Sequence, residues 1–231
     1  FLHYMLRQPL GVAVGFLAWN FPLLNVGYKL GPVLASGCSA IIKPSTYTPL
    51  ASLETAYLAK EAGIPDGVVN MITSSDHSVT AALVKSDVPS MVTMIGSTRG
   101  GLEIMNSSCT SIKHFSVELG GNAPVVVYPD ADVVDAAKKT VDLKFANCGQ
   151  VCVSPNRCFV HESVYDEFVV AAKARAAETT MGPMISAKAR EYVLGLVESA
   201  VADGAEVVCG GKAGEGDGFF MEPTILRGVV T

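Results

Sequence analysis

The stretch VAVGFLAWNFP, residues 12–22, decides the fold. Its first part, Val12 to Trp19, is uncharged and apolar, and Asn20 and Pro22 follow it closely. A short apolar run bounded by turn-forming residues predicts a strand buried on both faces, followed by a loop. Strands buried on both faces are typical of parallel sheets. We therefore expect the polar groups after this strand at the carboxyl edge of a sheet, where α/β proteins place their sites.

The wider uncharged run, from Arg7 to Lys29, is long enough to raise the question of a membrane span. Prolines, asparagines and glycines interrupt it, whereas a spanning helix needs about 20 mostly apolar residues without such breaks. Residues 1–7 also lack the basic-then-apolar pattern of a signal peptide. We expect no membrane association and a cytoplasmic location.

Strand-like and helix-like patterns alternate outward from this first strand. Further strands are expected at 39–42, 68–72, 91–95, 125–128, 157–160 and near 223–226. One helix is expected to have Thr48 as its N-cap and Pro49 as its first residue, and to end at Gly63. Further helices are expected over 79–84, from Asp132, from Ser163 and over 186–202, and a surface loop is expected at 210–218. Such alternation predicts an α/β protein with a parallel sheet.

Composition excludes several classes of function. The 231 residues are 49% apolar and carry a net charge of -5, so there is no basic footprint for nucleic acid or for an anionic membrane. The six cysteines include no Cys-x-x-Cys pair, and the four histidines lie far apart in the sequence. We therefore expect no metal site, and free thiols in a reducing compartment.

Polar groups cluster in three stretches that follow predicted strands or loops. These are Trp19-Asn20-Phe21-Pro22, Glu118-Leu119-Gly120-Gly121-Asn122 and Asn147-Cys148-Gly149-Gln150-Val151-Cys152. In type and in order, they resemble the signature motifs of the aldehyde dehydrogenase superfamily. The resemblance covers nearly the whole chain, and within the superfamily it is greatest to the lactaldehyde and semialdehyde dehydrogenases. It implies NAD(P)-dependent oxidation of a small aldehyde to a carboxylic acid.

The resemblance assigns the nucleophile to Cys152. Hydride cannot leave readily from a planar carbonyl carbon, so a thiolate must first add to that carbon and make it tetrahedral. The other interpretation of any single cysteine is a small buried apolar residue, which is how we interpret Cys148. A thiol hydrolase would need a histidine partner, and nothing in the sequence places one near Cys152.

The remaining catalytic roles also follow from the resemblance. The Asn20 side chain and the Cys152 backbone N–H are expected to form the oxyanion hole, and Glu118 is expected to be the general base that releases the acid. Superfamily members that transfer the acyl group to coenzyme A lack this glutamate, so Glu118 indicates hydrolysis. Lys29 matches a lysine near the site. The alternatives are a turn residue for Asn20, an exposed strand-end carboxylate for Glu118 and a surface lysine for Lys29.

The cofactor residues are also implied by the resemblance, because no Gly-x-Gly-x-x-Gly fingerprint is present. The family places the pyrophosphate near Gly96-Ser97-Thr98, with Gly101 closing the turn into a helix. Many members that use NAD carry glutamate where this chain has Thr46. Its absence, with Lys43 and Ser45 nearby, predicts that NADP is accepted as well as NAD. The full set of expected cofactor contacts is Leu17, Trp19, Lys43, Ser45, Thr46, Gly96, Ser97, Gly101 and Leu119.

The expected domains follow the motifs. Residues 1–9 are interpreted as the end of an oligomerisation arm, 10–120 as a Rossmann-like NAD(P)-binding domain, and 121–231 as an incomplete catalytic domain. The family's later Glu-x-Phe-Gly-Pro motif is absent, so we expect a partial chain of a homodimer or homotetramer. An alternative is a non-catalytic or redox-sensing protein on the same fold, using the thiols of Cys148, Cys152 and Cys158.

Overall fold

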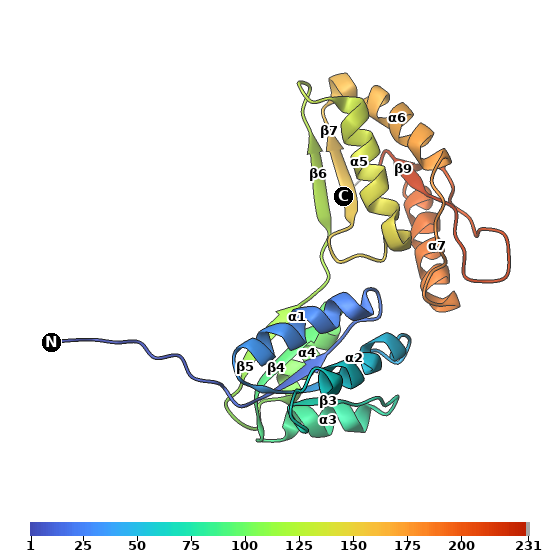
Figure 1. The fold of residues 1–231 in the computed structure, drawn as a ribbon. Coiled ribbons are helices and arrows are strands. Elements are labelled where there is room, and N and C mark those ends of the chain that lie inside the picture. The colour runs from blue at the N-terminus through green and yellow to red at the C-terminus, as the bar shows by residue number, and fades with distance from the viewer. Residues whose placement is uncertain (230–231) are drawn as a thin grey trace. The chain divides into compact units, whose positions relative to one another are not determined.

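The computed structural model describes residues 1–229, and the chain forms two compact units, Phe1–Gly120 and Gly121–Thr231. We call them unit 1 and unit 2 and describe each by itself (Figure 1).

Unit 1 is built around a five-stranded parallel sheet with the strand order β3-β2-β1-β4-β5. From β1, the chain moves outward through β2 and β3 and then returns to β4 on the other side of β1. The carboxyl ends of β1 and β4 therefore flank a topological switch point, where open α/β sheets bind ligands. The elements are β1 (Val12–Phe16), α1 (Pro22–Ala35), β2 (Ser39–Lys43), α2 (Leu50–Glu61), β3 (Val69–Met71), α3 (His77–Lys85), β4 (Pro89–Ile95), α4 (Thr98–Ser107) and β5 (His114–Glu118).

The central strand of this sheet is covered on both faces. Successive side chains of a strand point to opposite faces. Ala13 of β1 packs with Leu30 of α1, whereas Val14 packs in a second cluster with Val84 of α3 and Ile104 of α4. Burial on both faces explains why this stretch of sequence is continuously apolar.

Unit 2 has a smaller parallel pair, β6 and β7, and an antiparallel pair, β8 and β9. Its core lies where α5 and α6 pack together over β6 and β7 (Figure 1). The elements are β6 (Ala123–Val127), α5 (Val133–Phe145), the 3-10 turn η1 (Ala146–Gly149), β7 (Pro155–Val160), the 3-10 turn η2 (Glu162–Val164), α6 (Tyr165–Ala177), α7 (Ala187–Ala202), β8 (Glu206–Cys209) and β9 (Ile225–Arg227).

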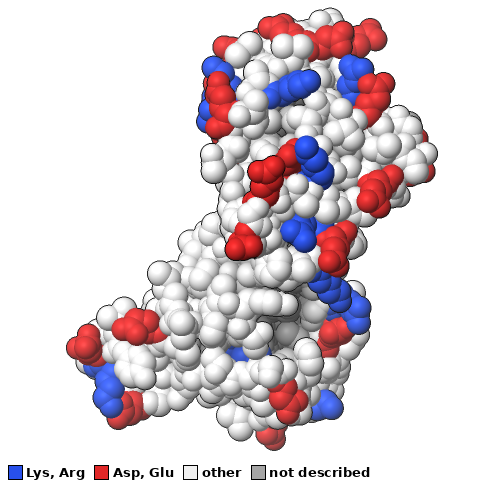
Figure 2. Space-filling model, turned by 90° about the vertical axis from the view of Figure 1, so that its right-hand side faces the viewer, with Lys and Arg blue, Asp and Glu red and all other residues white. Residues whose placement is uncertain are grey.

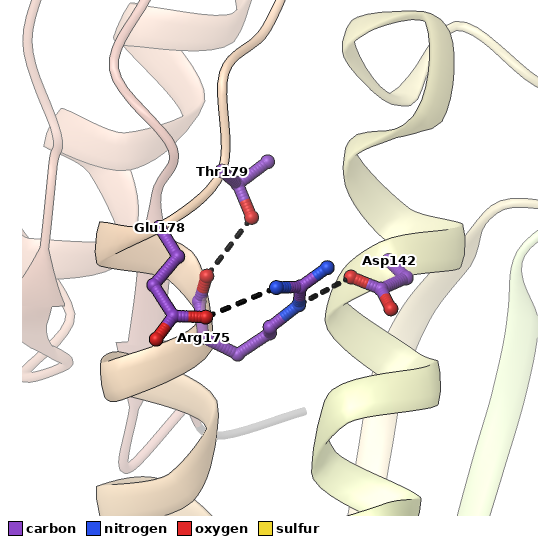
Figure 3. Close-up of polar contacts among 4 residues, drawn as sticks. All are labelled: Asp142, Arg175, Glu178 and Thr179. Carbon is purple, nitrogen blue, oxygen red and sulfur yellow. Dashed lines mark hydrogen bonds and ion pairs between the residues drawn. The ribbon is translucent and has the colours of Figure 1, made fainter.

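A polar bridge supplements the apolar contact between α5 and α6 (Figure 3). The Arg175 guanidinium donates to Asp142 at 2.7 Å across the helices and to Glu178 at 3.0 Å along the end of α6. The Thr179 hydroxyl donates to the Arg175 carbonyl at 2.9 Å. Exposed pairs contribute about 0.2–1 kcal/mol each, so this bridge orients α6 against α5 more than it stabilises the unit.

Several local predictions were wrong. The strand expected over Val12 to Trp19 ends at Phe16, and the expected loop after it contains a whole helix, α1, with Pro22 in its first turn. Pro is compatible with that position because its missing N–H has no helical acceptor there. The N-cap of α2 is Pro49 rather than Thr48, whose hydroxyl instead donates to the Trp19 carbonyl at 3.1 Å. The strands β5 and β8 were not predicted.

The role predicted for Gly101 was also wrong. The helix α4 begins at Thr98, so Gly101 lies inside it and does not close the turn before it. The reason for a glycine at this position is contact between elements. A Cβ on Gly101 would come within 2.8 Å of the Leu119 side chain.

Charged side chains of both signs are mixed over the face drawn in Figure 2, which shows no continuous basic area. Within residues 1–229, no helix is both long and apolar enough to cross a bilayer.

Candidate functional site

The loop after β1 carries Asn20, and a buried amide on α1 supports it. Asn25 is 4% exposed, and its Nδ2 donates to the Ala18 carbonyl at 3.0 Å and to the Asn20 Oδ1 at 3.5 Å. A buried amide without such partners would cost about 1–3 kcal/mol. Asn25 therefore holds the loop that presents Asn20. We did not predict this role, although an asparagine in an otherwise apolar segment was a visible signal.

Lys29 lies one helical turn after Asn25 and is not a surface lysine. It is 7% exposed, and burial lowers the pKa of its amine, while the charge of Glu118 acts in the opposite direction. Lys29 and Glu118 are therefore close enough to interact. Glu118 itself is the exposed last residue of β5. The structure thus brings together two of the predicted catalytic residues within unit 1.

The loop after β2 lines a hollow of about 250 Å³ at the carboxyl ends of β1 and β2. Burial lowers the pKa of the Lys43 amine in this hollow. Asp76 also faces it, but this carboxylate caps α3, accepting from the Ser78 N–H at 2.8 Å and from its hydroxyl at 2.5 Å. Four predicted cofactor residues line this hollow: Leu17, Lys43, Ser45 and Thr46.

The start of α4 follows the carboxyl end of β4. Ser97 is its N-cap, and the hydroxyl accepts from the Gly100 N–H at 3.1 Å. Gly96 donates its N–H to the Glu118 carbonyl at 3.0 Å, which ties this turn to the end of β5. Free N–H groups at a helix start suit an anionic group. The Met94 side chain lies over Gly96, where a Cβ would come within 2.3 Å of its Cε.

The predicted nucleophile lies in unit 2, in the loop between η1 and β7. Cys152 is exposed, and η1 turns the chain just before it through three residues with positive φ: Asn147 at 49°, Cys148 at 57° and Gly149 at 73°. Positive φ is unusual for residues other than glycine. The Ser154 N–H donates to the Val151 carbonyl at 3.1 Å and closes the loop on the far side of Cys152.

Two other thiols, those of Cys148 and Cys158, are near Cys152 in the sequence. Cys148 is half-buried, and burial raises the pKa of its thiol, an effect that the nearby Lys144 partly offsets. Cys158 is exposed as a residue, but its thiol is partly shielded from solvent, which raises its pKa, and the nearby Lys144 charge again acts in the opposite direction. A raised pKa reduces the thiolate fraction at neutral pH. All six cysteines are free in the structure, and residues 1–229 contain no cluster of His, Cys, Asp and Glu suited to a metal.

The predicted site residues therefore fall into two sets. Asn20, Lys29, Glu118 and all the expected cofactor residues belong to unit 1, and Cys152 belongs to unit 2. Within unit 1, the residues follow β1, β2, β4 and β5, whose carboxyl ends share one edge of the sheet. The edge in unit 1 is of the kind that can hold a dinucleotide, and the exposed thiol in unit 2 is of the kind that can add to a carbonyl carbon.

Similarity to known proteins extends over nearly the whole chain. The family model described as "Aldehyde dehydrogenase family" matches residues 1–231. The 3,6-anhydro-alpha-L-galactose dehydrogenase of a Vibrio species is 41% identical over 96% of this chain and 49% of its own length. Succinate-semialdehyde dehydrogenase [NADP(+)] 2 of Schizosaccharomyces pombe is 42% identical over 97% of this chain and 48% of its own. The chain thus spans about half the length of these relatives.

Solved structures share the fold as well. An Escherichia coli structure described as an NADP dependent enzyme has a TM-score of 0.94 and 39% identity, over 96% of this chain and 48% of that one. Succinate-semialdehyde dehydrogenase from Burkholderia pseudomallei has a TM-score of 0.94 and 35% identity, over 97% of this chain and 49% of that one. The predicted α/β class with a Rossmann-like parallel sheet is confirmed, and the chain belongs to the aldehyde dehydrogenase family.

Proposed function

We propose that the protein to which this chain belongs oxidises an aldehyde to a carboxylic acid with NAD or NADP. The observation that carries the proposal is the family match over residues 1–231. On this proposal, unit 1 is the cofactor-binding domain and unit 2 is part of the catalytic domain. Residues 1–9 are the end of an oligomerisation arm.

In the proposed reaction, the Cys152 thiolate adds to the aldehyde carbon and gives a thiohemiacetal. The Asn20 amide and the Cys152 N–H stabilise the oxyanion, which is worth about 2.7–4 kcal/mol per donor in comparable sites. A bound nicotinamide would supply the hydride acceptor, and loss of hydride from the thiohemiacetal carbon leaves a thioester on Cys152. Glu118 then removes a proton from the attacking water, and the acid is released. The exposure of Glu118 and Cys152 supports these roles, because both groups must reach substrate or water.

Lys29 has an electrostatic role in this scheme. The largely buried Lys29 amine lies within electrostatic range of Glu118. Lys29 therefore supports the position of the general base, and its own position depends on α1, the helix that also carries Asn25.

We also propose that NADP is accepted. The hollow at β1 and β2 offers the Lys43 ammonium and the hydroxyls of Ser45 and Thr46, which fit a ribose bearing a 2′-phosphate. No carboxylate at position 46 repels that phosphate. A Thr46→Glu variant should raise KM for NADP about tenfold or more and change KM for NAD little, because only the phosphate is repelled. Equal changes for both cofactors would contradict this assignment.

A semialdehyde or a small hydroxyaldehyde is the proposed substrate class. The S. pombe and B. pseudomallei relatives are both named succinate-semialdehyde dehydrogenases, which supports the first of these. We further propose a homodimer or homotetramer located in the cytoplasm.

The direct test is aldehyde-dependent reduction of NAD⁺ and, separately, NADP⁺ by the complete protein. Succinate semialdehyde, lactaldehyde and glycolaldehyde form the substrate panel, and Cys152→Ala is the matched variant. We expect turnover that falls at least 10³-fold in the variant, because no other group supplies the covalent step. A folded, cofactor-binding protein that oxidises none of these aldehydes would count against the proposal.

A further inference from the structure

We propose that Gln150 is a positioning residue for Cys152. Its side-chain amide clamps the left-handed turn before the nucleophile to the segment Pro183–Ile185. This inference rests on the proposed function, because it takes Cys152 to be the nucleophile. All the residues involved belong to unit 2.

The turn is a conformation that needs support from its surroundings. Asn147 and Cys148 are the only described residues other than glycine with positive φ, and they are adjacent. Each such residue costs on the order of 1 kcal/mol or more and persists only where contacts hold it. Gly149 continues the turn, and a Cβ there would lie 3.1 Å from the Lys144 carbonyl, so the turn packs closely on the end of α5.

The Gln150 amide contacts the turn on one side and a separate segment on the other. Its Nε2 donates to the Asn147 carbonyl at 3.0 Å, and the Gln150 backbone N–H donates to the same carbonyl at 3.1 Å. Its Oε1 accepts from the Ile185 N–H at 2.8 Å, and Nε2 also lies 3.4 Å from the Pro183 carbonyl. One side chain thus uses both its donor and its acceptor to join two parts of the chain.

The segment Pro183–Ile185, which Gln150 contacts, is held in place by its own contacts. Met184 is 8% exposed, and its N–H donates to the Phe219 carbonyl at 2.9 Å. The Met184 sulfur lies 3.4 Å from the Cys148 sulfur, so the turn contacts this segment at a second point. Directly afterwards, Ser186 caps α7 by accepting from the Ala189 N–H at 3.1 Å. The clamp therefore joins the nucleophile loop to a segment that is itself held by the cap of α7 and by the Phe219 carbonyl.

Cys152 lies two residues after Gln150, and its side chain is exposed. The backbone, rather than packing of the thiol, therefore sets where its sulfur and its N–H lie. Reacting atoms must be about 3–3.5 Å apart and aligned, and a shift of 1 Å can cost about 100-fold in rate. Releasing the clamp should therefore lower kcat while leaving the KM values for aldehyde and cofactor nearly unchanged.

The test compares three variants of the complete protein. Gln150→Leu removes every polar contact of the amide at nearly constant size. Gln150→Glu keeps an acceptor for the Ile185 N–H but loses both donations. Ser154→Ala is the matched control, since Ser154 lies equally far from Cys152 on the other side and its hydroxyl makes one long contact, 3.4 Å, to the Lys144 carbonyl.

We expect Gln150→Leu to lower kcat about 10- to 100-fold, with both KM values within about threefold of the wild type. Gln150→Glu should recover part of that loss, and Ser154→Ala should stay within about twofold of the wild type. Hydrogen exchange of the peptide covering 147–153 should accelerate most in Gln150→Leu, less in Gln150→Glu and least in Ser154→Ala. Wild-type exchange in Gln150→Leu, or a kcat loss no larger than that of Ser154→Ala, would overturn the proposal.

A second readout separates this inference from the proposed reaction. The pH profile of Cys152 alkylation by iodoacetamide needs no aldehyde turnover and can be followed by mass spectrometry. It should shift in Gln150→Leu and return toward the wild-type profile in Gln150→Glu. If the wild type oxidises no aldehyde but these shifts occur, the clamp stands and the proposed function fails. Either an unchanged alkylation profile or unchanged exchange in Gln150→Leu would refute the clamp. If Gln150→Leu does not fold, Gln150→Glu decides by the same two readouts.

Discussion

Two regions of this chain present their candidate functional groups in different ways. In unit 1, Asn20, Lys43, Gly96 and Glu118 lie at or just after the ends of four parallel strands. In unit 2, Cys152 lies in a loop that depends on a turn with positive φ and on the Gln150 amide. The first arrangement follows from the sheet itself, whereas the second is assembled from individual side-chain and backbone contacts.

The difference indicates where each region is vulnerable. Parallel register gathers the strand ends at one edge, so a single polar substitution there should change chemistry without disturbing the fold. The loop of unit 2 that carries Cys152 lies outside the strands, so strand pairing does not fix its geometry. That geometry depends on a few hydrogen bonds and on the close packing of Gly149 against the Lys144 carbonyl. Substitutions there should alter structure and chemistry together.

The largest effect that would test this contrast is expected for Glu118→Gln. The variant keeps the shape of the side chain but cannot act as a base, so steady-state turnover should fall about 10²- to 10⁴-fold. Because hydride transfer precedes hydrolysis, an initial burst of reduced cofactor should remain, and rapid mixing would detect it. Loss of the burst would mean that Glu118 acts before hydride transfer. Unfolding of the variant would contradict the view that the strand edge tolerates substitution.

A smaller effect is expected for Gly149→Ala, with Gly63→Ala as its control. Both glycines have positive φ, 73° and 83°, but an added Cβ meets the Lys144 carbonyl only at Gly149, whereas nothing lies within 4 Å at Gly63. Gly63→Ala should lower the free energy of unfolding by about 1 kcal/mol, and Gly149→Ala by about 2 kcal/mol or more. Urea unfolding would measure both. Equal losses would show that the close approach in the nucleophile loop is unimportant.

The smallest effect concerns Lys29. In the folded chain, burial lowers the pKa of its amine. In the unfolded chain, the amine holds its proton up to about pH 10.4. Between the lowered folded pKa and that value, the unfolded chain binds more protons, so the Lys29 contribution makes stability rise with pH. Lys29→Met removes this contribution. The stability of the Lys29→Met variant relative to that of the wild type should therefore be greatest near neutral pH, and this difference should become smaller toward pH 10. Thermal unfolding of both proteins at several pH values measures this difference. A stability difference that stays constant from pH 7 to pH 10 would contradict the prediction.

Comparison with the sequence-based predictions follows the same division. The apolar run at β1 predicted a buried parallel strand, and the structure confirms it because burial on both faces leaves no polar alternation to obscure the pattern. The helix α1 escaped prediction because its prolines, glycines and asparagine resemble a loop. Its cause is tertiary, since Val26, Leu30 and Val33 pack on the sheet. The roles assigned to Asn20, Glu118 and Cys152 remain predictions.

The linear sequence was enough for the α/β class, the family and the identity of the candidate reactive groups. Hydrophobic periodicity and short motifs are local, and residues close in sequence carry them. Only the tertiary structure revealed that Asn25 supports the Asn20 loop, that Lys29 is buried within electrostatic range of Glu118, and that Gln150 contacts Pro183 and Ile185. Each of these depends on a contact between segments distant in sequence or on burial by another element, and neither property is encoded in the spacing of residues along the chain.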